Sequence, residues 1–215
     1  MDKFIKLDEA VDQIKDGMTV MIGGFLGCGS PHNIIDKLVD KGVKDLTIIA
    51  NDTSFVDYGL GKLVANKQVK KVIASHVGTN KETGRQMNEK ETEVILVPQG
   101  TLAEQIRAAG AGLGGILTPT GVGTIVEEGK EKIEIEGKEY LLELPLSADI
   151  ALIKGSKVDN LGNVYYEKST RNFNTIMATA AETVIVEAEE IVDEINPNDV
   201  MTPNIFVDYI VGGEK

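Results

Sequence analysis

The first part of the chain alternates between short apolar runs and segments with helical spacing. The continuous apolar run at residues 18–22 is typical of a strand buried on both faces of a sheet. Further strands are predicted at residues 45–51, 69–75 and 92–98. The segments with helical periodicity lie at residues 7–15, 32–42, 81–90 and 100–112. Strands that alternate with helices predict βαβ units and a largely parallel sheet.

The ends of two helices carry recognisable signals. Gly17 is a plausible stop for the first helix, and Gly42 for the second. Ser30 followed by Pro31 predicts a helix with serine as N-cap and proline at the first helical position.

The pattern changes after residue 112. Residues 110–124 form a long loop rich in glycine and threonine, and residues 127–144 alternate strictly around Glu136-Gly137, which predicts a β-hairpin. Further segments complete the pattern: strands at 148–155 and 183–192, a turn and short strand at 160–167, a helix at 169–182, and turns at Pro197 and Pro203. We therefore expect residues 1–215 to form a single α/β domain. Its open, largely parallel sheet is flanked by helices, and the second half adds an antiparallel hairpin.

Composition narrows the class of protein. The chain has 215 residues, of which 42% are hydrophobic and 26% charged, as in ordinary globular proteins. No apolar run approaches the ~20 residues of a membrane span, and residues 1–17 lack the apolar region of a secretory signal. Cys28 is the single cysteine, so no internal disulfide forms. We expect a cytoplasmic location without membrane association.

The net charge of −12 bears on the partners. No cluster of lysine and arginine is dense enough for nucleic-acid binding, so none is expected. An anionic cofactor would need backbone N–H groups, or cations from another chain. The two histidines, His32 and His76, offer little material for a metal site, and none is predicted.

The stretch DGMTVMIGGFLGCGSP, residues 16–31, places four glycines within seven residues where a strand ends and a helix begins. Such glycines often serve only tight backbone geometry. A helix N-terminus beside a glycine-lined crevice also binds anions, and open α/β sheets bind ligands at the carboxyl ends of their strands. A ligand site is therefore favoured.

The glycine order excludes the common nucleotide motifs. No G-x-G-x-x-G register fits Gly23, Gly24, Gly27 and Gly29, although Asp52 follows the second strand where a ribose-binding acid would stand. The Gly-Lys-Ser/Thr of a Walker motif is absent. An NAD-dependent enzyme and a non-catalytic ligand-binding module of related α/β fold remain as alternatives.

One longer pattern carries a family resemblance. It consists of Asp16-Gly17, two free positions, Val20-Met21-Ile22, Gly23-Gly24-Phe25, three free positions, Gly29, one free position and Pro31. This pattern resembles the first signature of the family I coenzyme A transferases. The stretches GVKDLTIIAND, SHVGTN, VPQGTLAEQIRAAGAGLGGILTPTGVGT, RNFN and AAETVIVEAEEIVD are also similar to the α subunit of this family, chiefly the bacterial acetate/butyrate–acetoacetate type. The resemblance extends to the N-terminal half of the fused succinate:3-oxoacid enzyme.

The resemblance implies a function shared with a second chain. These enzymes move CoA from a short-chain acyl-CoA to a free carboxylate through a glutamyl-CoA thioester. The family's attacking glutamate lies in a Ser-Glu-Asn-Gly motif of the β subunit, and this motif is absent here. We therefore expect an α subunit within an α2β2 assembly. CoA is its substrate, and no cofactor is tightly bound.

The resemblance also assigns site residues. Seven residues of the glycine-rich loop would line the thioester pocket: Gly23, Gly24, Phe25, Leu26, Gly27, Cys28 and Gly29. The amide of Asn51 would face the substrate, and Gln99 would stabilise the oxyanion. Both amides could instead satisfy local backbone groups at strand ends. The stretch EAEE at 187–190 is interpreted as solvated charge, and Cys28 as a small apolar filler.

Overall fold

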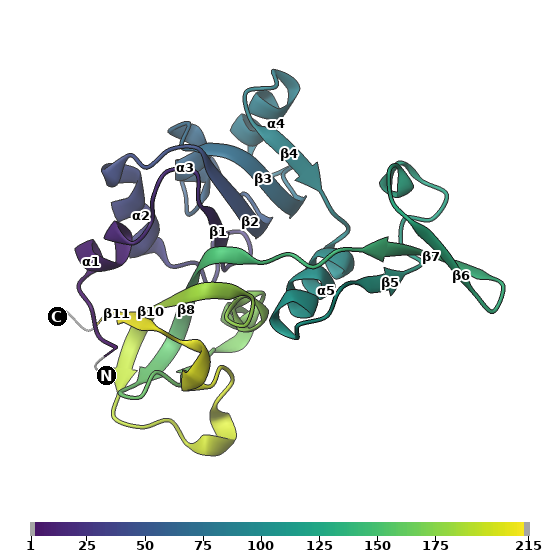
Figure 1. Cartoon of the computed structure of the whole chain (residues 1–215). Helices are drawn as coiled ribbons and strands as arrows, with labels where there is room; N and C mark the ends of the chain where they lie inside the picture. Colours follow the sequence, from purple (N-terminus) through teal and green to yellow (C-terminus); the bar gives the residue numbers. More distant parts are fainter. Residues whose placement is uncertain (1–2, 213–215) are drawn as a thin grey trace.

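The computed structural model describes residues 3–212, in which a large sheet carries the fold (Figure 1). Its strands follow the order β11-β10-β8-β1-β2-β3-β4, and all neighbours in this path are parallel. The short strand β9 (Val164–Tyr165) pairs with β8 in the antiparallel direction. The strands of the path are β1 (Thr19–Ile22), β2 (Leu46–Asp52), β3 (Val69–His76), β4 (Glu93–Leu96), β8 (Ala148–Asp159), β10 (Ala181–Val192) and β11 (Tyr209–Val211).

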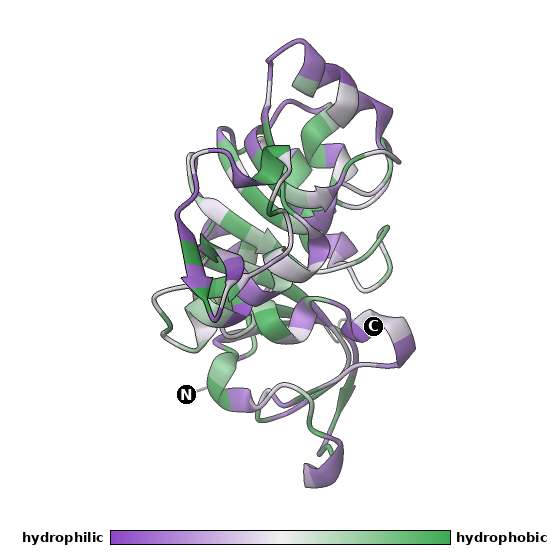
Figure 2. Cartoon of the chain, turned by 90° about the vertical axis from the view of Figure 1, so that its right-hand side faces the viewer, coloured by the Kyte–Doolittle hydropathy of each residue, from purple (hydrophilic) through white to green (hydrophobic). Residues whose placement is uncertain are grey.

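Helices cover both faces of this sheet. Val20 and Ile22 of β1 pack in one core with α1, α2 and α3, whereas Met21 packs in a second core with α5 and α6. This alternation follows from the two-residue period of a strand. The hydrophobic colour in Figure 2 accordingly concentrates in the central strands. The helices are α1 (Leu7–Asp12), α2 (His32–Lys41), α3 (Gly61–Ala65), α4 (Lys81–Asn88), α5 (Gln99–Gly110) and α6 (Asn174–Met177).

A small antiparallel sheet projects away from the large one (Figure 1). It has the order β5-β7-β6, with β5 at Ile116–Thr118, β6 at Lys132–Ile135 and β7 at Lys138–Glu143. Glu136 and Gly137 take φ values of 52° and 76° at the turn, as a two-residue hairpin requires. The predicted α/β class with an antiparallel appendage is confirmed.

Some predicted boundaries are wrong. The first helix ends at Asp12 rather than near Gly17. Ser30 does not cap α2, because Pro31 is its N-cap and the Ser30 hydroxyl donates to the carbonyl of Gly23 at 3.0 Å. The helix predicted at 169–182 is reduced to a 3₁₀ turn (η2, Lys168–Arg171) followed by α6. The predictions lacked α3, β5 and β11.

Between residues 3 and 212 no helix has the length and apolar character needed to cross a membrane. The same residues contain no group of three or more His, Cys, Asp or Glu side chains suited to a metal ion.

Candidate functional site

Residues 23–29, here called the glycine loop, lie at the carboxyl end of β1. The N–H of Gly23 donates to the carbonyl of Leu152 on β8 at 2.9 Å, which attaches the start of the loop to the sheet. After the loop the chain passes through Ser30 and Pro31 into α2. The loop therefore stands where ligands bind in open α/β sheets.

Gly23 and Gly24 are required by close neighbours. A Cβ on Gly23 would lie 1.8 Å from Oδ1 of Asn174, and a Cβ on Gly24 would lie 1.9 Å from Oγ of Ser30. Gly24 also has a φ of +128°, which residues with a Cβ rarely adopt. Both positions therefore exclude any larger residue unless the neighbours move.

Gly27 and Gly29 are confined in the same way on the other side of the loop. A Cβ on Gly27 would lie 2.1 Å from the ring of Tyr58. A Cβ on Gly29 would lie 2.7 Å from the carbonyl oxygen of Thr170 and 2.8 Å from Nδ2 of Asn172. Their φ values are +82° and +72°. All four glycines thus allow close approach of other segments to the loop.

Most N–H groups of the glycine loop are already hydrogen-bonded within the chain. Phe25 and Cys28 each donate to the other's carbonyl at 2.9 Å. Gly24 donates to Oδ1 of Asn172 at 3.1 Å, and Leu26 donates to Oδ2 of Asp52 at 3.0 Å. These N–H groups are consequently unavailable to a ligand in this conformation.

Two N–H groups of the loop are left over. Within residues 3–212, those of Gly27 and Gly29 have no hydrogen-bond acceptor. Gly27 is buried, whereas Gly29 is half-buried. The N–H of Gly29 is therefore the loop donor best placed to meet a ligand.

Asn51 and Gln99 lie together at the same edge of the sheet. Gln99, the first residue of α5, donates from Nε2 to Oδ1 of Asn51 near the end of β2 at 3.2 Å. The Ser75 hydroxyl also donates to Oδ1 of Asn51, at 2.9 Å. Asn51 is buried and Gln99 is exposed. The Nδ2 group of Asn51 has no acceptor among the described residues, so it remains a free donor.

Asp52 joins the glycine loop to the end of β2. Its Oδ2 accepts from Leu26, and its Oδ1 accepts from the N–H of Ser54 at 2.7 Å. The side chain is buried, and both carboxylate oxygens are used inside the chain. Asp52 therefore links the glycine loop to β2, and its carboxylate is not free to bind a ribose.

A second loop after β2 packs against the first. Phe55 and Tyr58 form an isolated antiparallel bridge, as Phe25 and Cys28 do in the glycine loop. The ring of His32 lies 4.6 Å from the ring of Tyr58, centroid to centroid, and its Nε2 lies 2.9 Å from the carbonyl oxygen of Gly27. His32 thus holds the two loops together.

Cys28 differs from the sequence-based interpretation. The side chain is exposed and its Sγ lies 3.3 Å from Oγ of Ser169, so the interpretation as an apolar filler is wrong. The backbone N–H and carbonyl of Cys28 are bonded to Phe25, while its side chain stays exposed.

Glu187 of β10 caps the N-terminus of α2, although it lies far from this helix in the sequence. Its Oε2 accepts from the N–H of Ile34 in the first turn of α2 at 2.9 Å, and its Oε1 accepts from Nδ2 of Asn33 at 3.3 Å. Nζ of Lys154 on β8 lies 3.5 Å from Oε1. The residue is 1% exposed, so the prediction of solvated charge is wrong for Glu187. Burial of this acid is tolerated because the helix terminus and Lys154 compensate its charge.

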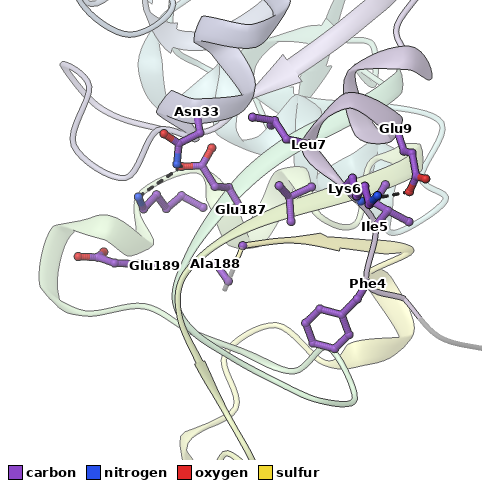
Figure 3. A pocket seen from close by; sticks show the side chains of 12 residues that line it. Phe4, Ile5, Lys6, Leu7, Glu9, Asn33, Glu187, Ala188 and Glu189 are labelled. Carbon is purple, nitrogen blue, oxygen red and sulfur yellow. Dashed lines mark hydrogen bonds and ion pairs between the residues drawn. The ribbon is translucent and has the colours of Figure 1, made fainter. Parts of the chain in front are cut away.

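A cavity of about 680 Å³ lies beside this cap (Figure 3). Figure 3 shows Asn33 and Glu187 pointing toward one another at its wall. Phe4, Ile5 and Leu7 also line it. Burial raises the pKa of Glu187, and the contacts with Ile34 and Lys154 oppose that rise only in part.

Comparisons with known proteins identify the family. The coenzyme A transferase family model matches residues 4–213. The acetate CoA-transferase subunit alpha of Escherichia coli (strain K12) is 54% identical over 215 residues, covering 99% of this chain and 98% of that one. The acetoacetyl-CoA:acetate/butyrate CoA transferase alpha subunit of Clostridium acetobutylicum is 56% identical over 211 residues, covering 97% of each.

A solved structure has the same fold. An acyl-CoA transferase of Escherichia coli O157:H7, in a thioester complex with CoA, superposes with a TM-score of 0.86 at 24% identity. The match covers 98% of this chain and 47% of that one. The chain belongs to the coenzyme A transferase family, as the resemblance in the sequence predicted. It is of the α-subunit type within this family of enzymes.

We predict that Gly29→Ala destabilises the chain more than Gly42→Ala. Both glycines have a φ of +72°, so each substitution costs the ~1–2 kcal/mol of the left-handed region. Only Gly29 has neighbours inside contact distance, whereas a Cβ on Gly42 meets nothing within 4 Å. Urea unfolding of both variants measures the difference. Equal losses of unfolding free energy in the two variants would contradict the prediction, because they would show that Thr170 and Asn172 move aside at no cost.

We predict that Glu187→Gln becomes relatively more stable than the wild type as the pH rises. Because the folded pKa of Glu187 lies above its ordinary value of 4.5, the folded state binds more protons than the unfolded state above that pH. The stability that the protonated acid contributes is therefore complete below 4.5 and lost as the pH rises through the folded pKa. Urea unfolding between about pH 4.5 and 7.5 measures it.

The matched control for this experiment is Glu189→Gln, because Glu189 lies two residues along β10 and is exposed. Its stability relative to the wild type is expected to change little over the same pH range. If the wild type instead gained stability relative to Glu187→Gln with rising pH, the helix terminus and Lys154 would outweigh burial.

Proposed function

We propose that this chain is half of an active site that exchanges CoA between short-chain acyl-CoA thioesters and free carboxylates. Acetate, butyrate and acetoacetate are the carboxylates we propose. The observation that carries this proposal is the identity of 54–56% with two α subunits of such enzymes over at least 97% of both chains. The names of both relatives specify acetate, and one adds acetoacetyl-CoA and butyrate.

The proposed reaction is covalent. A glutamate carboxylate of the partner chain attacks the thioester carbonyl, the C–S bond breaks, and a mixed anhydride forms while CoA leaves as the thiolate. The thiolate then attacks the glutamyl carbonyl, which releases the first carboxylate and leaves a glutamyl-CoA thioester. The second carboxylate repeats these steps in reverse order. Each attack places a negative charge on a carbonyl oxygen.

This chain would supply the donors for that charge. The N–H of Gly29, Nδ2 of Asn51 and the side-chain amide of Gln99 are donors at the carboxyl edge of the sheet. Because such donors are fixed before the reaction, they stabilise a developing oxyanion more than water does. The rest of the glycine loop would shape the thioester pocket.

The partner would supply most of the positive charge for CoA. At a net charge of −12, this chain is poorly suited to hold the phosphates of CoA alone. We propose a β subunit with lysines and arginines at the nucleotide end of CoA, in an α2β2 assembly in the cytoplasm. CoA would be a substrate, without a tightly bound cofactor. We also propose that residues 1–215 form a single domain.

We predict that CoA transfer needs both chains. This chain alone should show no transfer from acetyl-CoA to acetoacetate or butyrate, because it contains no Ser-Glu-Asn-Gly motif. Mixing it with the product of a neighbouring β-type reading frame should produce turnover. The appearance of acetoacetyl-CoA or butyryl-CoA measures the reaction.

A β chain whose motif glutamate is changed to glutamine is the control and should remain silent in the mixture. Turnover by the present chain alone would mean that the nucleophile lies on this chain. Binding of NADH without any CoA transfer in the mixture would favour the dehydrogenase alternative.

We predict that Gln99→Ala lowers kcat of the assembled enzyme by about 10²–10³-fold, the usual effect of removing an oxyanion donor. The KM for acyl-CoA should change little, since the donor acts mainly in the transition state. Gln13→Ala at the end of α1 serves as the control for loss of a glutamine. A change in KM alone would assign Gln99 to substrate binding instead.

A further inference from the structure

We infer that Asn172 is a positioning residue that sets the direction of the Gly29 N–H. This inference rests on the proposed function, in which that N–H meets the oxyanion. Asn172 follows the 3₁₀ turn η2 and precedes α6, so it reaches the glycine loop from a distant part of the chain. The residue was not among the site residues predicted from the sequence.

The side-chain amide of Asn172 ties the two ends of the glycine loop together. Its Oδ1 accepts from the N–H of Gly24 at 3.1 Å, and its Nδ2 donates to the carbonyl of Cys28 at 3.0 Å. Nδ2 also donates to the carbonyl of Ser169 at 2.9 Å, and Oδ1 accepts from the N–H of Phe173 at 2.7 Å. The last two bonds fix the orientation of the amide relative to its own segment, so the side chain that binds the loop is itself held in place.

The bond to Cys28 determines where the next N–H points. The carbonyl of Cys28 and the N–H of Gly29 belong to one planar peptide, and the structure contains no cis peptide among its described residues. The two groups therefore point in opposite directions. Since Phe25 and Asn172 both donate to the Cys28 carbonyl, they fix the plane of this peptide and leave the Gly29 N–H turned away from them.

A second asparagine holds the following peptide. Asn174 is fully buried, and its Nδ2 donates to the carbonyl of Gly29 at 2.9 Å and to that of Thr170 at 2.7 Å. Its Oδ1 accepts from the N–H of Lys154 at 3.2 Å. The peptides on both sides of Gly29 are thus held by side-chain amides anchored elsewhere in the fold.

The role of Asn172 needs a donor and an acceptor on one short side chain. A carboxylate of the same shape has only acceptors. Asn172→Asp would therefore retain the bond from Gly24 but set an oxygen against the carbonyl oxygen of Cys28. The peptide of Gly29 should rotate away, and this makes Asn172→Asp a more specific test than a truncation.

The experiment compares Asn172→Asp with Asn88→Asp, which adds the same charge at an exposed position of α4. In the assembled enzyme we expect Asn172→Asp to lower kcat by about 10–100-fold, since small misplacements of a reacting group have effects of this size. The KM for acyl-CoA should stay within about threefold of wild type, as for loss of a transition-state contact. Asn88→Asp should leave both constants unchanged.

A second measurement needs no partner and no turnover. Amide hydrogen exchange of the isolated chain, followed by NMR with ¹⁵N-glycine, reports on Gly24 and Gly29 directly. Asn172→Ala should accelerate exchange at Gly24, because this variant removes its acceptor. Asn172→Asp should instead keep Gly24 protected and shift the Gly29 resonance.

The outcomes separate the inference from the proposed function. A normal kcat for Asn172→Asp, with the Gly29 resonance shifted, would overturn the positioning role while transfer by the wild type supported the function. An unchanged rate of hydrogen exchange at Gly24 in Asn172→Ala would show that Asn172 does not hold the glycine loop. If the wild-type pair transferred no CoA, the proposed function and the catalytic part of the inference would both fail. The exchange data would still decide whether Asn172 holds the loop.

Discussion

The structure depends on the close approach of other segments to the backbone of residues 23–29. Asn174, Ser30, Tyr58 and Thr170 each occupy the space that a Cβ would take on one of four glycines. This contact brings together segments from both halves of the chain. It also uses most of the N–H groups of the loop inside the protein. The sequence suggests an open anion-binding loop, but most of its N–H groups are bonded inside the protein. Of the two residues with a free N–H, Gly29 is the less buried.

The parts of the fold that could be predicted from the sequence are those set by local pattern. Apolar residues identified the strands from β1 to β4. Burial on both faces explains the apolar runs of β1 and β2, whereas β4 leaves Ile95 and Leu96 exposed. The hairpin of β6 and β7 was also predictable, since Glu136-Gly137 fits a two-residue turn. β5 and β11 have three residues each, too few to establish a period, and were missed.

The remaining errors have tertiary causes. Ser30 before Pro31 has the local signature of an N-cap, but its hydroxyl bonds to Gly23, and Glu187 accepts from the first turn of α2 instead. Nothing near Glu187 in the sequence distinguishes it from its exposed neighbours. The role of Asn172 was also missed, because its two partners in the glycine loop, Gly24 and Cys28, lie 148 and 144 residues earlier in the chain. Asn51 and Gln99 could be placed at one edge, since Asn51 lies at the carboxyl end of one parallel strand and Gln99 follows another, and the structure brings them together.

Under the proposed function, the apolar and polar groups at the carboxyl edge of the sheet explain why the site would need a second chain packed over it. Phe25, Phe55 and Tyr58 expose 45%, 41% and 45% of their surface around the glycine loop. Gln99 is exposed at the same edge, where water competes for its amide. Oxyanion donors stabilise charge most when water is excluded. A second chain packed on these rings would bury apolar surface and would also exclude water from the hydrogen-bond donors. Association of the two chains and activation of the site would then have the same physical cause.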